Sequence, residues 1–520
     1  MGKVVKVDRN PVAEHLEAVG RASVSEQTDR WVSSLKNLDN RCADISRRRK
    51  VALDLLVGRI NYEQTDAVPY HARGMKLDRM RQLLIRLDSP ERKVKIVHVA
   101  GTKGKGSTAA MIASVLTAAG YRTGLFSSPH LARIEERMVV DNRTASSEEF
   151  VHLMRRVWPA VEAMDAEAAV AAQACGGSSE AGPTYFEIAT ALALLHFVDR
   201  EVDVAVLEVG LGGRLDSTNV CLPEVSVITN ISLDHVHLLG TTIAEIAREK
   251  AGIIKPGVPL VSGATEADAR QTIEHVALGH GARLLQMRRD FDFHYHSPVS
   301  VDIQPTAAAF DYRSLVSGDQ RRLDGLTIGM LGRHQAENAA VALATLDELR
   351  RQGWDLPEKA VRSGLARASI PARVEIVGRH PTVVVDAAHN VASVDALIEV
   401  IKESFAAGPR ILVFATARDK DVRGMLGQLA PHFDEVVLTR YENNPRAVTV
   451  EELDLIAAEV MTCRRHRAAS PTDAWRLVGR LATPKHLVSI VGSFFIAAEM
   501  RRLAAEQPLS RPDESAREAV

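Results

Sequence analysis

A glycine-rich segment between an apolar run and a helical pattern constrains most strongly what this chain can fold into. Residues 96–107 read Ile-Val-His-Val-Ala-Gly-Thr-Lys-Gly-Lys-Gly-Ser, and a helical pattern follows from Thr108 to Ala119. Glycines let backbone N–H groups approach an anion, and a helix start adds the positive end of its dipole. Lys105 would reach nucleotide phosphates as a point charge, and Ser107 stands where a hydroxyl can meet Mg²⁺. The segment predicts a strand–loop–helix phosphate cradle.

This segment matches the usual phosphate-binding loop only in part. That loop has a glycine five residues before Gly104, where this chain has Val99. What remains is Gly101-x-x-Gly104-Lys105-Gly106-Ser107. Two interpretations stay open on the loop alone: nucleotide binding, or a tight strand-to-helix connection that uses glycine only for its turn.

The composition indicates a soluble globular protein. The 520 residues suggest two or three domains, and 46% are hydrophobic and 25% charged. The net charge of −1 gives no field that favours nucleic acid or an anionic membrane. The four cysteines lack metal-ligand or redox spacing, and we find no signal peptide or membrane-spanning run. We therefore expect a cytoplasmic protein with no nucleic-acid or membrane partner.

Apolar runs and helical patterns alternate from residue 95 onward. Val/Ile/Leu-rich runs, typical of strands buried on both faces, occur at 95–100, 121–127, 202–209, 225–231 and 259–263. Helical patterns lie at 105–119, 148–165, 186–199, 241–250 and 266–278. This alternation predicts an α/β fold with a parallel sheet. We expect a mobile loop at 166–183 and a β excursion within 288–330.

A second α/β series starts after Pro371, with strands expected at 382–387, 410–416, 435–440 and 486–492. We therefore predict a parallel-sheet P-loop ATPase domain followed by a smaller Rossmann-like α/β domain. The expected parts are an N-terminal extension (1–50), a central domain (51–369), a second domain (370–506) and a polar tail (507–520). The basic run at 47–50 could bind an anion, but a solvated face is the simpler interpretation.

Polar clusters follow several expected strands, at the sheet edge where open α/β folds bind ligands. They are Ser127–His130, Glu208–Asp216, Ser232–His237, Asp386–Asn390 and Gly492–Ser493. Each alone fits a turn or a cap, and the His-x-His pair at 235–237 lacks a further zinc ligand nearby. Together they indicate a site between the strand ends.

Ten short segments carry a resemblance to a known family. They are Gly-Thr-Lys-Gly-Lys-Gly-Ser (101–107), Ser-Ser-Pro-His-Leu (127–131), Thr-Tyr-Phe-Glu (184–187), Glu-Val-Gly-Leu-Gly-Gly-Arg-Leu-Asp-Ser-Thr-Asn (208–219), Leu-Asp-His (233–235), Glu-Lys-Ala-Gly-Ile-Ile-Lys (249–255), Pro-Ala-Arg (371–373), Asp-Ala-Ala-His-Asn (386–390), Asp-Lys-Asp (419–421) and Gly-Ser-Phe (492–494). In this order they resemble the folylpolyglutamate synthase/dihydrofolate synthase family of ATP-dependent Mur-type ligases. The resemblance covers about residues 60–503.

The resemblance implies a set of site residues. For ATP they are Gly101, Thr102, Lys103, Gly104, Lys105, Gly106, Ser107, Asn338, Arg373 and Asp386. For Mg²⁺ they are Ser128, Glu208 and His235; for the pteroate they are Thr184, Tyr185, Phe186, Arg214 and Asp216. For L-glutamate they are Asp386, His389 and Ser493, and the catalytic residues are Lys105, Lys250 and His235. Lys105 should reach the phosphates, whereas Lys103 should point to solvent.

Two of these assignments rest on the resemblance alone. Mg²⁺ prefers oxygen ligands, so nothing in the chemistry of His235 itself selects it. Lys250 matches a lysine that is carbamylated in the family. The alternative is a lysine placed near a helix C-terminus by the helix dipole.

The resemblance implies an ATP-dependent amide ligase that acts through an acyl phosphate. We favour a bifunctional enzyme that adds L-glutamate to dihydropteroate and to folate polyglutamates. The alternatives are a dedicated folylpolyglutamate synthase and an NTP-binding module without turnover; the polar residues of the second domain argue against the module. We expect a monomer.

Overall fold

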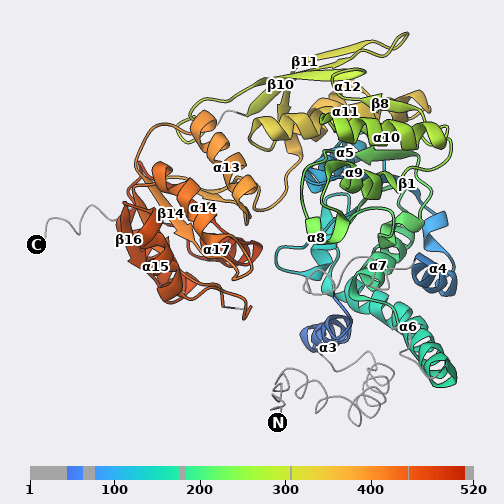
Figure 1. Cartoon of the computed structure of the whole chain (residues 1–520), viewed down its shortest axis with the longest axis horizontal. Helices are drawn as coiled ribbons and strands as arrows, with labels where there is room; N and C mark the ends of the chain where they lie inside the picture. The colour runs from blue at the N-terminus through green and yellow to red at the C-terminus, as the bar shows by residue number, and fades with distance from the viewer. Residues whose placement is uncertain (1–43, 62–76, 176–181, 305–306, 443, 510–520) are drawn as a thin grey trace, which may run out of the picture.

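The computed structural model describes residues 44–61, 77–175, 182–304, 307–442 and 444–509. Figure 1 shows two α/β domains side by side, the second drawn in orange and red. None of the helices in these ranges combines the length and apolarity needed to cross a membrane. The mixed α/β fold with two sheet domains confirms the predicted fold class.

An eight-stranded sheet forms the middle of the central domain, in the order β4-β3-β2-β5-β1-β6-β7-β8. Its strands are β1 (Lys95–Ala100), β2 (Thr123–Phe126), β3 (Met138–Val140), β4 (Arg143–Thr144), β5 (Val204–Glu208), β6 (Val225–Ile228), β7 (Leu260–Ser262) and β8 (Leu284–Gln286). Neighbouring strands pair in parallel along the run β2-β5-β1-β6-β7-β8. Strands β3 and β4 pair antiparallel and form one edge of the sheet. The parallel arrangement brings the carboxyl ends of β1, β2, β5 and β6 to one edge.

Helices cover both faces of this sheet. They are α3 (Ile45–Val57), α4 (Leu77–Arg86), α5 (Lys105–Ala118), α6 (Ser147–Cys175), α7 (Tyr185–Asp199), α8 (Val236–Leu239), α9 (Ile243–Ala251), α10 (Ala267–Gly279), α11 (Arg333–Arg351) and α12 (Glu358–Arg367). Alternate residues of β1 enter different cores: Val97 and Val99 pack with α5, α11 and α12, and Ile96 packs with α4, α6 and α7. This two-sided burial explains the continuous apolar runs of the sequence.

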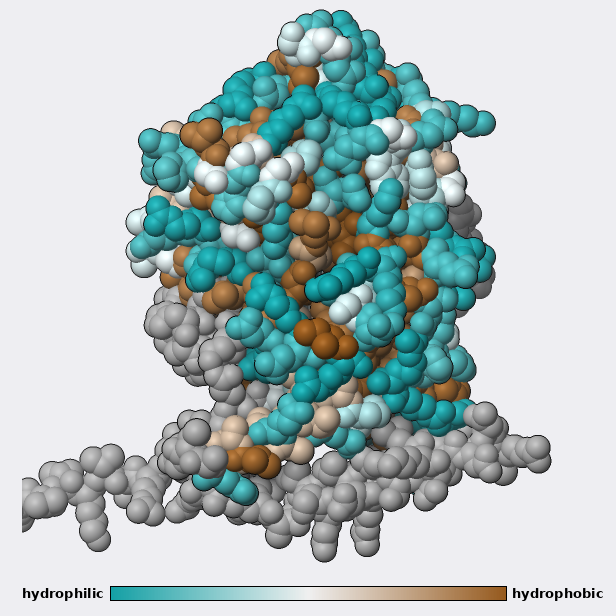
Figure 2. Space-filling model, turned by 90° about the vertical axis from the view of Figure 1, so that its right-hand side faces the viewer, coloured by the Kyte–Doolittle hydropathy of each residue, from teal (hydrophilic) through white to brown (hydrophobic). Residues whose placement is uncertain are grey.

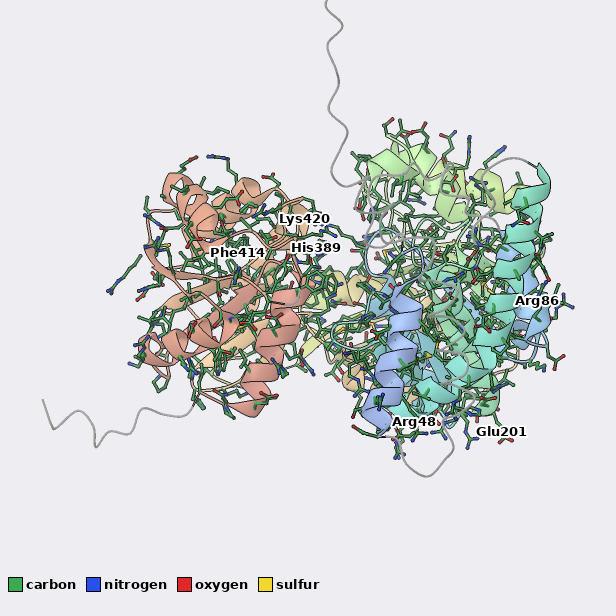
Figure 3. The ribbon with its side chains drawn as sticks, turned by 90° about the horizontal axis from the view of Figure 1, so that it is seen from below. Arg48, Arg86, Glu201, His389, Phe414 and Lys420 are labelled. Carbon is green, nitrogen blue, oxygen red and sulfur yellow. The ribbon has the colours of Figure 1, made fainter. Side chains whose placement is uncertain are left out.

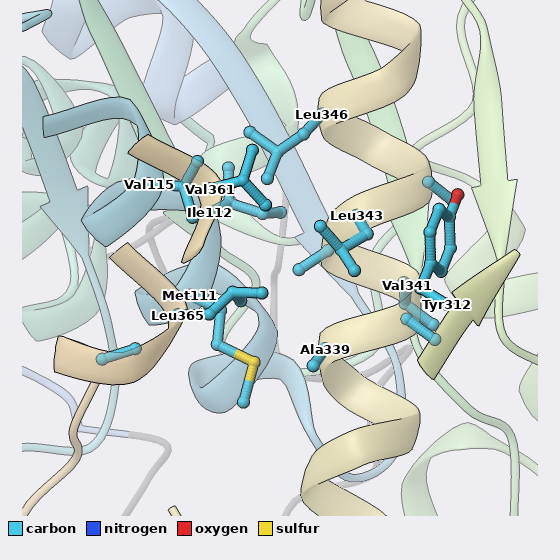
Figure 4. Packing of buried hydrophobic residues seen from close by; sticks show 14 of the residues in the cluster. Met111, Ile112, Val115, Tyr312, Ala339, Val341, Leu343, Leu346, Val361 and Leu365 are labelled. Carbon is cyan, nitrogen blue, oxygen red and sulfur yellow. The ribbon is translucent and has the colours of Figure 1, made fainter. Parts of the chain in front are cut away.

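Helix α5, which follows the glycine-rich loop, is held on several sides. Its Met111, Ile112 and Val115 lie near residues of α11 and α12 in a buried cluster (Figure 4). Substitutions that open this cluster would loosen the helix that begins at the loop, because large core side chains contribute roughly 2–5 kcal/mol each.

The expected β excursion is a three-stranded antiparallel sheet of β9 (Phe291–His296), β10 (Ala308–Ser314) and β11 (Arg321–Ile328). The mobile loop expected at 166–183 is wrong for residues 166–175, which continue α6. This stretch is rich in alanine, the strongest helix former, and that propensity outweighs the nearby turn residues. Residues 176–181 lie outside the described chain.

The second domain has a six-stranded sheet in the order β12-β13-β17-β14-β15-β16. Its strands are β12 (Glu375–Gly378), β13 (Thr382–Val385), β14 (Arg410–Phe414), β15 (Glu435–Leu438), β16 (Arg464–Arg467) and β17 (Leu487–Val491). Its helices are α13 (Val391–Ser404), α14 (Val422–Leu429), α15 (Val450–Val460), α16 (Pro471–Leu481) and α17 (Phe494–Glu506). Because β17 lies between β13 and β14, the segments after these three strands meet at one edge.

The two domains are attached at a second point besides the linker after α12. Val301, from the segment after β9, lies in the apolar core of the second domain. Its backbone N–H donates to Ser404 O (2.9 Å), and Arg379 donates to its carbonyl (2.8 Å). This attachment gives the two domains a second connection, besides the covalent linker.

The predicted domain limits stay proposals. Helix α3 runs through residue 50, where we placed the end of the extension, and β12 starts five residues after the limit at 370.

The face of the central domain away from the second domain is largely hydrophilic, with hydrophobic side chains scattered among polar ones (Figure 2).

Candidate active site

The glycine-rich loop forms a tight cradle between β1 and α5. Gly101 and Gly104 have φ angles of +149° and +82°, a region that favours glycine. A Cβ on Gly104 would lie 2.1 Å from Asn338 Oδ1, and one on Gly101 would lie 1.9 Å from Thr229 Oγ1. Glycine at these two positions is therefore required by backbone conformation and by space. The same closeness puts Asn338, the nucleotide contact expected from the resemblance, against the loop.

The segment after β6 holds the cradle in shape. The N–H of Thr102 donates to Asn230 O (2.8 Å), and the N–H of Lys103 donates to Asn230 Oδ1 (2.8 Å). Thr229 Oγ1 donates to Lys103 O (2.6 Å). These bonds order the loop before any ligand binds, which lowers the entropy cost of binding.

Three lysines surround the loop in different environments. Lys105 is half-buried and its Nζ donates to Gly101 O (3.2 Å) and Thr102 O (3.3 Å), whereas Lys103 is exposed. Lys250 is only 4% exposed and its Nζ donates to Gly101 O (2.8 Å). Burial, and then the charge of Lys105, lower the pKa of Lys250 to about 7. An amine of this kind is partly neutral at neutral pH.

A buried carboxylate lies beside the cradle. Glu208, at the end of β5, is buried and accepts a hydrogen bond at Oε2 from the N–H of Ser128 (3.0 Å). Burial raises its pKa, and the positive charges of Lys105 and Arg373 oppose that effect. Its oxygens lie 3.3–3.5 Å from the position of a Cβ on Gly106. Glu208 therefore faces the first turn of α5, where a nucleotide phosphate would lie.

Glu208 and Ser128 offer the oxygen atoms that Mg²⁺ prefers. The described residues contain no cluster of three or more His, Cys, Asp or Glu side chains placed to hold a metal ion. A Mg²⁺ ion at Glu208 would therefore take further oxygens from phosphates and water, as the resemblance implies. The His235 side chain is 52% exposed, and its Nε2 lies 3.8 Å from Asp234 Oδ2 of its own loop.

Two of the residues expected to bind the pteroate are aromatic, and the other three hold the surrounding segments through a helix cap, an ion pair and hydrogen bonds. Tyr185 is buried, and Phe186 lies against Phe126 with ring centroids 5.8 Å apart. Thr184 caps α7, and Arg214 pairs with Glu249 (2.9 Å). Asp216 is buried and accepts the N–H groups of Gly210 and Leu211, both at 3.0 Å. Thr184 thus shapes the start of α7, and Asp216 shapes the loop that follows β5.

Sequence reasoning missed Arg137, which is 1% exposed. Its guanidinium lies 5.4 Å from the ring centroid of Tyr185 and 6.0 Å from that of Phe186, and its Nε donates to His130 Nδ1 (2.9 Å). Burial, and then the charge of Arg137, lower the pKa of His130 to about 3, so this imidazole is neutral. A buried arginine in a Glu-Arg-Met sequence gives no signal of its own, because burial depends on contacts far along the chain.

Asp386 organises the site residues of the second domain. Its carboxylate accepts the N–H of Val374 and the N–H of Ala388, both at 2.8 Å. These two residues flank Arg373 and His389, so one carboxylate fixes both backbones. Burial raises the pKa of Asp386, and the charge of Arg373 opposes that effect. Ser493 caps α17 by accepting the N–H of Ile496 (3.2 Å).

His389 has a defined tautomer. Its Nδ1 lies 2.9 Å from Ala387 O, and because a carbonyl only accepts, Nδ1 carries the proton. Burial lowers the pKa of His389, so the neutral ring keeps its lone pair on Nε2. Lys420 also lowers this pKa through its charge, and Figure 3 shows both residues on the side of the second domain that faces the first. The Asp-Lys-Asp segment (419–421) is the sequence signal that marks Lys420 as a further residue of this site.

Electrostatic effects connect the two domains at this site. Arg373 acts on Glu208 of the central domain and on Asp386 and His389 of the second domain. Asp234, after β6, acts on both Lys250 and His389. The strand-end clusters of the sequence thus converge between the two sheets, next to the phosphate cradle. The arrangement is that of a nucleotide-dependent ligase.

Comparisons with known proteins agree with this class. Residues 99–346 match the Mur ligase middle domain, and residues 372–494 match the Mur ligase glutamate ligase domain. The chain is 36% identical over 429 residues to the dihydrofolate synthase/folylpolyglutamate synthase of Bacillus subtilis (82% of this chain, 94% of the relative). It is 33% identical over 450 residues to the folylpolyglutamate synthase of Lacticaseibacillus casei (85% and 98%).

A solved structure shows the same fold. The folylpolyglutamate synthase of Mycobacterium tuberculosis, complexed with ADP and AMPPCP, superposes with a TM-score of 0.75 at 32% identity, covering 91% of this chain and 100% of that one. The chain therefore belongs to the folylpolyglutamate synthase/dihydrofolate synthase family of Mur-type ligases, and it is an ATP-dependent ligase.

Proposed function

We propose that this chain joins L-glutamate both to dihydropteroate and to the terminal glutamate of reduced folates, using ATP. The observation that carries the proposal is that two groups of residues with different chemistry face each other between the two domains. The phosphate cradle with Lys105 lies on one side, and His389 with Asp386, Arg373 and Ser493 lies on the other. A nucleotide switch without turnover has no need of the second set.

The first step is activation of the pteridine substrate's carboxylate. A carboxylate oxygen attacks the γ-phosphorus of ATP, the bond to the β–γ bridging oxygen breaks, and ADP leaves. Lys105 and the N–H groups of the loop meet the charge that builds up on the phosphoryl oxygens. Glu208 and Ser128 would hold part of the coordination shell of a Mg²⁺ ion, which would supply further positive charge there.

The second step forms the amide. The amine of L-glutamate attacks the acyl phosphate carbon, and inorganic phosphate leaves. The neutral His389, with its lone pair on Nε2, would accept a hydrogen bond from the incoming ammonium and take up its proton. The cationic Arg373 and Lys420 would meet negative charge on glutamate or phosphate. Both domains contribute to this step, which shields the acyl phosphate from water.

Lys250 would act as its carbamate. Its amine is buried next to Lys105. A second ammonium group there would repel both a bound metal ion and the ammonium group of Lys105. The neutral amine would attack the carbon of CO₂, form an N–C bond and release one proton, so that an anionic carbamate takes the place of the ammonium group. The low pKa supports this assignment because only a neutral amine reacts. Action as a cytoplasmic monomer remains a prediction.

The proposal is tested by ADP release in a coupled assay. We expect the protein to form ADP with dihydropteroate plus L-glutamate and also with tetrahydrofolate plus L-glutamate, and to form none when either partner is omitted. Activity with the folate alone would leave a dedicated folylpolyglutamate synthase. Activity only with a nucleotide-linked peptidoglycan precursor would contradict the folate assignment.

A further inference from the structure

Phe494 is the first residue of α17, and it brings together two site residues from distant segments. The guanidinium carbon of Arg373 lies 5.4 Å from the Phe494 ring centroid. The ring of His389 lies 5.5 Å away on centroids, tilted by 45°. Arg373 comes from the linker between the domains, and His389 follows β13.

The backbone around this ring is already fixed, so the ring governs where the side chains point. Asp386 holds the N–H groups of Val374 and Ala388. Ser493 caps the first turn of α17 and so fixes the position from which Phe494 projects. Arginine loses considerable rotamer freedom when it is held in one place, and the face of an aromatic ring attracts a guanidinium.

The ring also sets the surroundings of the imidazole. His389 is half-buried, and the charged groups that act on it are Lys420, Arg373 and Asp234. A phenyl ring excludes water from one side of the imidazole and keeps the cation of Arg373 beside it. Both effects favour the neutral imidazole, whose Nε2 lone pair can accept from an ammonium group.

We propose that Phe494 is a positioning residue that holds Arg373 and His389 side by side, so that the pair receives the incoming α-amino acid: the guanidinium meets a carboxylate and the imidazole accepts from the ammonium. This inference rests on the proposed function, which it deepens by naming the residue that aligns the amino-acid side of the reaction. Phe494 need not touch either substrate.

Kinetics of Phe494→Leu and Phe494→Tyr test this role. We expect Phe494→Leu to raise the KM for L-glutamate about 10-fold, the size of a lost cation–π contact and ring alignment, with the KM for the pteridine substrate unchanged. Phe494→Tyr keeps the ring and should stay within about 2-fold of the wild type. The control is Phe495→Leu, because Phe495 is 38% exposed and contacts Tyr441 instead. Its kinetics should match the wild type.

A second measurement does not depend on turnover. In NMR of histidine-labelled full-length protein, with His389 assigned by the His389→Gln difference, Phe494→Leu should raise the imidazole pKa toward the ordinary value and Phe494→Tyr should leave it low. An unchanged His389 pKa in Phe494→Leu, or equal rises of KM for both substrates, would overturn the inference. If the wild-type protein fails to ligate glutamate but the pKa shift occurs, the proposed function is wrong and the ring–imidazole contact stands.

Discussion

Replacing Lys105 with alanine is expected to lower kcat about 1,000-fold, the size of losing one main charge that stabilises a transition state. Lys105 begins α5 and its Nζ lies among the loop carbonyls of Gly101 and Thr102, at 3.2 and 3.3 Å. These long bonds are weak, so the amine can turn toward a phosphate at little cost. Steady-state ADP release with both substrates saturating measures the effect.

Lys103 is the matched control for this prediction. It lies two residues earlier in the same loop but is exposed, and its backbone rather than its side chain is held by Asn230. Lys103→Ala should therefore retain activity within a few-fold. Equal, small losses from both variants would mean that Lys105 does not serve the phosphates.

Replacing Lys250 with alanine is expected to leave the protein nearly inactive, with partial rescue by a small carboxylic acid that fills the vacated space. The simpler alternative is a lysine placed by the dipole of α9, but that interaction contributes at most about 2 kcal/mol and does not require burial, whereas Lys250 is 4% exposed. Burial next to Lys105 favours a group that is not an ammonium ion.

Lys250→Arg separates the two roles, because arginine keeps the positive charge but cannot form a carbamate. We expect it to be as inactive as Lys250→Ala. Carbon NMR of the wild-type protein equilibrated with labelled bicarbonate should show a carbamate signal that Lys250→Ala lacks. Because the pKa of Lys250 is lowered to about 7, the neutral amine is lost as the pH falls below 7, and the signal should fade with it. A fully active Lys250→Arg enzyme would refute the carbamate.

The sequence predicted the central strands that are buried on both faces and missed the polar edge strands β4 and β16. Strands β1, β5 and β6 read as continuous apolar runs because helices cover them on both sides. Strand β16 reads Arg-Arg-His-Arg and lies at a sheet edge, where polar side chains reach solvent, so nothing in its composition marks a strand. Strand β4, at one edge of the central-domain sheet, is short and exposed, so its composition does not mark a strand either.

The candidate site was predictable where local sequence carries the chemistry. The glycines of the cradle are visible because a positive φ angle favours glycine, and the polar strand ends are visible because each follows an apolar run. The roles of Arg137 and Phe494 depend on which side chains meet across long stretches of chain. Their positions could not be inferred without the fold.

We expect the pteridine carboxylate to be activated by phosphoryl transfer before the amide forms. Ligation with a substrate labelled with ¹⁸O in the reacting carboxylate tests it most directly, by mass spectrometry of the released phosphate. An acyl phosphate requires one labelled oxygen to pass from the carboxylate to inorganic phosphate for each amide made. Phosphate without label, from a reaction that forms the glutamyl amide, would contradict the account.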